Sequence, residues 1–79
     1  MITVLFFGPV AEALGASRID VEWAPGMRLE DLRAQLQARH PEAFALVSLA
    51  AVDGVQVRDA SLPLKNGSEV VFMSKFSGG

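Results

Sequence analysis

The residues best suited to chemistry in this sequence are its last two, Gly78 and Gly79, which follow Phe76 and Ser77. A main-chain carboxylate has a pKa of about 3.5 and is ionised at neutral pH. Glycine has no Cβ, so the walls of an enzyme channel can close directly on the backbone. We therefore expect the carboxylate of Gly79 to be the reactive group, which enters a narrow site in a partner enzyme, is activated there and is handed on.

No side-chain constellation competes with that carboxylate. The sequence has no cysteine, which excludes disulfides, thiolate catalysis and cysteine-ligated metals. The single histidine, His40, is interpreted as a helix-terminal or surface residue. Glu30 and Asp31 are neighbours on a predicted helix and do not face each other, and Ser77 has no partner base. We predict no metal site and no cofactor bound by this chain alone.

Size and composition restrict the function further. The 79 residues suffice for one domain, yet 51% of them are hydrophobic, which predicts apolar surface left over for a partner protein. The formal net charge is −2 and the seven basic residues are scattered, so nucleic acid is not an expected partner. No apolar run approaches the roughly 20 residues of a membrane span, and we expect a soluble, cytoplasmic protein.

The first half of the chain predicts two strands and two helices. Residues 2–7 are almost continuously apolar, which favours a central strand covered on both faces. A short helix is predicted over residues 9–14, between Pro9 and Gly15. Residues 17–23 alternate as a half-buried strand, and residues 28–39 form a long helix that Pro41 ends. That helix lacks the usual Ser, Thr or Asp cap at its start. A short helical turn is predicted over residues 42–47.

The second half predicts strands and the fold. Asp53-Gly54 separates strands at residues 49–52 and 55–57, and Asn66-Gly67 leads into a last strand at residues 69–73. The first and last strands are both apolar, so we pair them in parallel at the sheet centre, with the long helix across one face. The predicted fold is an α+β β-grasp (ubiquitin-like) domain over residues 1–73, with a mixed sheet of four to five strands and a flexible tail over residues 74–79.

The sequence resembles the small, sulfur-carrier subunit of molybdopterin synthase, a ubiquitin-like β-grasp sulfur carrier, over essentially its whole length. The segments that carry the resemblance are Val4-Leu5-Phe6-Phe7, the helical Gly8-Pro9-Val10-Ala11-Glu12-Ala13-Leu14-Gly15, Ala51-Val52-Asp53-Gly54, Pro63-Leu64-Lys65-Asn66-Gly67-Ser68-Glu69-Val70-Val71-Phe72 and the closing Ser77-Gly78-Gly79. Two departures stand out. Ser74-Lys75 replaces the prolines that often precede the tail, and Asp53 replaces a frequent asparagine.

The resemblance implies a set of partners. An E1-like adenylyltransferase would use ATP to adenylate the Gly79 carboxylate, and a sulfur donor protein would convert the acyl adenylate into a thiocarboxylate. The loaded tail would then enter the large subunit of molybdopterin synthase and give its sulfur to a pterin precursor. This chain would be the sulfur-donating, non-catalytic subunit of a sulfurtransferase.

Docking outside that partner requires a surface near the tail. Phe7 closes the first predicted strand and Met73 the last, so both are predicted at the partner interface, with Phe72 alternating to the opposite face. An ordinary core position is the competing interpretation for Phe7 and Met73. Lys75 is also placed at the partner interface, where it would steer the tail toward an acidic or phosphate-bearing site. A solvated flank is the competing interpretation for Lys75.

Three other functions stay open on the sequence. The same chemistry can serve thiazole formation for thiamine or sulfur delivery to cysteine, although thiazole carriers are typically shorter where this chain has the helix at residues 9–14. The second of these functions is that of a ubiquitin-like modifier, joined to lysines through Gly79. The third is that of a binding module in which the terminal glycines have no role.

Overall fold

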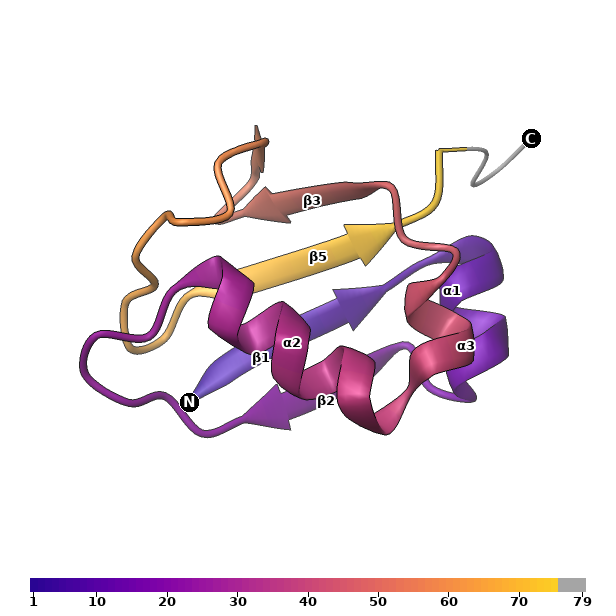
Figure 1. Cartoon of the computed structure of the whole chain (residues 1–79), viewed down its shortest axis with the longest axis horizontal. Coiled ribbons are helices and arrows are strands. Elements are labelled where there is room, and N and C mark those ends of the chain that lie inside the picture. The colour runs from indigo at the N-terminus through magenta and orange to yellow at the C-terminus, as the bar shows by residue number, and fades with distance from the viewer. Residues whose placement is uncertain (76–79) are drawn as a thin grey trace.

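The fold is organised around the parallel pairing of the two most apolar strands. The computed structural model describes residues 1–75, and its elements in chain order are β1 (Ile2–Phe6), α1 (Gly8–Leu14), β2 (Arg18–Val21), α2 (Leu29–Arg39), α3 (Pro41–Phe44), β3 (Leu49–Val52), β4 (Val55–Val57) and β5 (Glu69–Met73). The sheet order is β2-β1-β5-β3-β4, with β1 and β5 parallel and α2 lying across one face (Figure 1). This mixed five-stranded sheet confirms the predicted α+β β-grasp fold.

The core lies between the sheet and its helices. Alternate residues of β1 and β5 point toward α2, and the stripe predicted on that helix, Leu29, Leu32 and Leu36, is buried against them. Phe6 and Phe72 stack with their ring centroids 6.3 Å apart. Phe44 of α3 meets both rings edge-on, at 6.1 Å from Phe6 and 5.1 Å from Phe72. Large aromatic rings in these geometries dominate the burial energy of a small core.

The first backbone N–H groups of α2 find acceptors although the helix has no Ser, Thr or Asp cap. Arg28 is the N-cap residue, and its backbone N–H donates to the Asp31 carboxylate at 2.9 Å. The next two backbone N–H groups, of Leu29 and Glu30, donate to main-chain carbonyls of a distant loop, at 2.9 Å and 2.8 Å. Those acceptors belong to Leu62 and Ala60. Main-chain carbonyls therefore satisfy the donors that a Ser or Asp cap usually serves.

Turn residues act largely as predicted. Gly15 ends α1 in the left-handed conformation at φ 81°, and its N–H donates to the carbonyl of Ala11. Asp53 and Gly54 both have positive φ, at 50° and 83°, as a two-residue hairpin turn of type I′ requires. The Asp53 carboxylate also accepts from the Glu69 N–H at 2.9 Å, which ties the hairpin to the start of β5.

Several predicted boundaries were wrong by a few residues. The strand predicted over residues 17–23 ends at Val21, and the indole N–H of Trp23 donates to the Leu64 carbonyl at 2.9 Å outside the sheet. His40 caps the end of α2, as predicted, while Pro41 both stops α2 and occupies the first turn of α3. α3 ends at Phe44 rather than at residue 47.

The prediction that β1 is covered on both faces was also wrong. Its even-numbered residues are fully buried beneath the helices, whereas Thr3 and Leu5 are only half-buried. The reason is the two-residue period of a strand, which sends Thr3 and Leu5 to the sheet face away from the helices. One face of this central strand therefore remains partly uncovered.

Neighbouring phenylalanines give a matched test of this packing. We expect Phe6→Ala to lower the free energy of unfolding by about 3–5 kcal/mol, because it removes a ring from the aromatic cluster. Phe7→Ala should cost no more than about 1 kcal/mol, since half of that side chain is already exposed. Urea unfolding of both variants measures the difference. Equal losses would contradict the assignment of the two side chains to opposite faces.

Candidate functional site

The sheet face turned away from the helices is apolar at one end. Residues paired across neighbouring strands share a face, and Leu5 pairs with Val71, which in turn pairs with Ala51. One step nearer the carboxyl end of β5, Met73 pairs with Leu49. We call these five residues together with Phe7 the open apolar face.

Phe7 belongs to this face because its backbone continues the extended geometry of β1. Its φ and ψ are −129° and 158°, and it follows Phe6, the last β1 residue registered with β5. The Phe7 side chain is 50% exposed, and Met73 is half-buried. Neither residue is an ordinary core residue. The structure brings both to the same edge of the sheet, as the sequence predicted. Phe72, which precedes Met73 and points to the opposite face, is fully buried.

The other end of this face is acidic. Thr3 pairs with Asp20 on one side and with Glu69 on the other. Arg18 lies on the same face as Asp20, and their side chains form an ion pair at 3.5 Å on the solvated edge. The apolar surface is thus confined to the end of the sheet where β1 and β5 terminate. Confined apolar surface of this kind marks interaction sites.

Of the predicted tail over residues 74–79, the structure describes Ser74 and Lys75. Four predicted site residues, Phe76, Ser77, Gly78 and Gly79, lie outside the residues that the structure describes. Lys75 is the last described residue; its side chain is exposed and lies toward the helix side of the sheet. The structure thus places Lys75 away from Phe7 and Met73, although all three were predicted to serve one interface.

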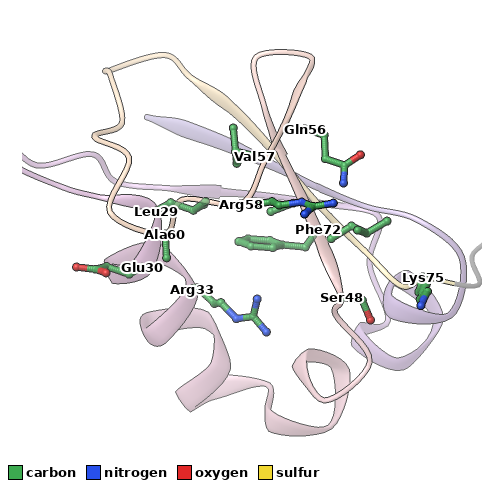
Figure 2. A pocket seen from close by; sticks show the side chains of 12 residues that line it. Leu29, Glu30, Arg33, Ser48, Gln56, Val57, Arg58, Ala60, Phe72 and Lys75 are labelled. Carbon is green, nitrogen blue, oxygen red and sulfur yellow. The ribbon is translucent and has the colours of Figure 1, made fainter.

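A groove of about 510 Å³ lies on the helix side, between α2 and the β3–β4 hairpin. Arg33 on α2, Arg58 just after β4 and Lys75 line it, above a floor that includes Leu29 and Phe72 (Figure 2). Sequence reasoning missed this cluster. Its three basic residues are far apart in the chain, and only the fold brings them to one groove.

A tight turn forms part of the groove wall beside Ala60. Asp59 Oδ1 accepts hydrogen bonds from the Ser61 hydroxyl at 2.6 Å and from the Ser61 N–H at 2.9 Å. These two bonds hold the pKa of Asp59 below its ordinary value. Desolvation opposes the lowering, and the charge of Arg28 adds a lesser contribution to it. Ala60 is in the same turn, and its carbonyl accepts a hydrogen bond from the N–H of Glu30.

We expect Ser61→Ala to raise the pKa of Asp59 toward its ordinary value, because the hydroxyl makes the stronger contribution to the lowering. A carboxyl whose pKa is depressed in the folded state contributes stability above its unfolded pKa, and that contribution is lost as pH falls through the folded pKa. The wild-type chain should therefore lose more stability on acidification than Ser61→Ala. An NMR titration of the Asp59 carboxyl measures the shift, and an unchanged pKa would contradict the role of the hydroxyl.

Other kinds of site are not found in the described part of the chain. Residues 1–75 hold no cluster of three or more His, Cys, Asp or Glu side chains placed to ligate a metal ion. Within the same residues, no helix is both long and apolar enough to cross a membrane.

Comparison with known proteins identifies the family of this sequence. The ThiS family profile matches residues 4–79, which is nearly the whole sequence. The chain belongs to the ThiS family. The resemblance to β-grasp carriers drawn from the sequence is thereby confirmed at the level of the family. A search of curated protein sequences gave no significant match.

Solved structures share the fold at low sequence identity. SAMP1 from Haloferax volcanii is 18% identical with a TM-score of 0.82, covering 99% of this chain and 98% of that one. A candidate molybdopterin converting factor subunit 1 from Pyrococcus furiosus is 23% identical with a TM-score of 0.81, covering 92% and 94%. A chain in the complex of subunits 1 and 2 of molybdopterin-converting factor from Helicobacter pylori is 23% identical with a TM-score of 0.71, covering 99% and 97%.

Proposed function

We propose that this chain is a sulfur carrier of molybdopterin synthesis, whose Gly79 carboxylate carries the sulfur. The proposal rests on one observation: the open apolar face lies at the end of β5, whose last residue, Met73, is three residues before Phe76. Membership of the ThiS family, with a match that extends to residue 79, supports the same role. Two fold relatives carry the name of molybdopterin converting factor.

The chemistry requires a partner to activate the carboxylate. In an E1-like adenylyltransferase, the Gly79 carboxylate oxygen attacks the α-phosphate of ATP and pyrophosphate leaves. The terminal sulfur of a donor persulfide then attacks the acyl carbon and AMP leaves, which gives an acyl disulfide. A second thiol attacks the donor's inner sulfur, forms a disulfide with it and releases the thiocarboxylate. A carboxylate is a poor electrophile until it is joined to such a leaving group. This chain contributes the acyl group and the surface that presents it.

The open apolar face is the proposed docking surface for the large synthase subunit. Phe7, the most exposed aromatic side chain among the described residues, is the natural anchor, with Met73 beside it. Interfaces of this kind concentrate binding energy in a few buried aromatic or apolar anchors. The segment from Ser74 to Gly79 spans at most about 20 Å when extended, which is enough to enter a site below the docked surface.

A ubiquitin-like protein modifier is the second candidate. The likeness to SAMP1, whose fold covers 99% of this chain, favours it. A thiazole or cysteine pathway carrier is a third, against which α1 between β1 and β2 counts. All of these functions use an activated Gly79, so they differ in the acceptor rather than in the first step.

The first test is intact mass. Incubation of the full chain with an E1-like enzyme, ATP and a persulfide-bearing sulfur donor should exchange one oxygen atom of the chain for sulfur. A variant that lacks Gly79 is the matched control and should stay unmodified while keeping its fold. An unchanged wild-type mass would overturn the carrier proposal, and isopeptide adducts on lysines would favour the modifier.

The second test addresses docking. We expect Phe7→Ala to weaken binding to the large subunit by about thirtyfold or more, as loss of an interface anchor does. Val55→Ala is the matched control, because Val55 is 63% exposed but shares the helix-side face with Val52. Calorimetric titration of the large subunit measures both. Equal effects of the two substitutions would remove the open apolar face from the interface.

A further inference from the structure

We infer that the groove between α2 and the β3–β4 hairpin binds an acidic peptide segment with one apolar side chain, supplied by a partner protein. This groove lies mainly on the helix side of the sheet (Figure 2), and it shares Leu49 with the open apolar face that is proposed to dock the large subunit. The inference goes beyond the proposed function and stands independently of it.

Charge is the first argument for an acidic ligand. The chain carries a net charge of −2, yet three of its seven basic residues, Arg33, Arg58 and Lys75, line this one groove. The sole ion pair among residues 1–75 lies elsewhere, between Arg18 and Asp20. Figure 2 shows the carboxylate of Glu30 at the groove margin directed away from the guanidinium groups. The groove is thus a local cationic site on an acidic protein, complementary to carboxylates.

The floor of the groove is the second argument, because it fits an apolar side chain. Leu29, Ala50 and Phe72 are almost fully buried and form its base. The apolar lining that solvent can reach is completed by Leu49, Val57 and Ala60. A cavity of about 510 Å³ is within the range that holds a compact ligand. A carboxylate alone would leave this floor unused, whereas an apolar residue flanked by acids would use both parts.

The neighbouring sheet edge is the third argument, and it favours a peptide over a small anion. β4 is the last strand in the sheet order, so its outer side has no strand partner in the described structure. An extended peptide can add to such an edge through main-chain hydrogen bonds, with alternate side chains directed to one face. Val57 is on β4 and also lines the groove. A peptide bound along β4 would therefore place its side chains over the apolar floor.

The experiment is an NMR titration of the full ¹⁵N-labelled chain. The probes are capped peptides of the form Glu-Glu-X-Glu-Glu, in which X is Leu, Ile, Phe or Trp. At least one should shift the amides of Arg33, Gln56, Val57 and Arg58, with binding that weakens as salt rises. Replacement of X by Gly should weaken binding, and so should replacement of every Glu by Lys.

Matched variants locate the site. We expect Arg58→Glu and Arg33→Glu each to weaken binding of the best peptide by about tenfold, because each removes a charge-assisted hydrogen bond. Arg39→Glu is the control for charge, since Arg39 lies at the other end of α2, outside the groove; it should change binding by less than about twofold. The amide spectrum of each variant reports whether the fold is retained.

Three outcomes would overturn the inference. The first is that no peptide of the series shifts the groove amides. The second is that inorganic phosphate displaces the peptide as well as a competing peptide does, which would make the groove a small-anion site. The third is that the shifts gather instead at Leu5, Val71 and Met73, which would move peptide binding to the open apolar face.

Discussion

The parallel pairing of β1 with β5 is the constraint on which the rest of the structure depends. It stacks Phe6 on Phe72 in the core, and it brings the carboxyl ends of two strands far apart in the sequence to one edge. Because side chains alternate along a strand, the residues next to this stacked pair, Phe7 and Met73, lie on the opposite face. The same two strands therefore supply the centre of the core and the centre of the open apolar face. A substitution that shifts the register of either strand alters both at once.

The sheet divides the protein into two surfaces of different chemistry. The open face is apolar near the ends of β1 and β5 and acidic near Thr3, where Asp20 and Glu69 stand. The helix side has a groove with basic residues at its rim. Lys75 belongs to that groove and yet follows Met73 of the open face by only two residues. The chain passes from one surface to the other immediately before the segment 76–79.

Local signals in the sequence were enough for most of the fold. The Asp53-Gly54 turn fixed the β3–β4 hairpin, and Gly15 fixed the end of α1, because few residues tolerate the positive φ that both sites need. The apolar character of β1 and β5 predicted their central place, and the positions of Phe7 and Met73 at the ends of the predicted strands placed both at the same edge of the sheet. These features depend on residues close in sequence or on a simple period.

Features that depend on distant partners escaped prediction. The start of α2 uses the carbonyls of Ala60 and Leu62, about thirty residues away, so no cap residue marks it in the sequence. β2 ends at Val21, and Trp23, which was predicted in the strand, donates its indole N–H to the carbonyl of Leu64. The groove needs Arg33, Arg58 and Lys75 from three separate segments, which looked like scattered charges in the sequence. Each of these three features depends on contacts between residues far apart in the chain. A single sequence does not show which distant residues come into contact.

The pKa shift of Asp59 differs in origin from the shifts that are usual at catalytic sites. Sites of catalysis usually hold groups whose pKa is shifted by burial and by charged neighbours. The pKa of the Asp59 carboxyl is instead lowered chiefly by two hydrogen bonds from Ser61 in an exposed turn. In the proposed function the reactive group is the main-chain carboxylate of Gly79, so the side chains need only select partners. The open apolar face and the groove would then select different ones.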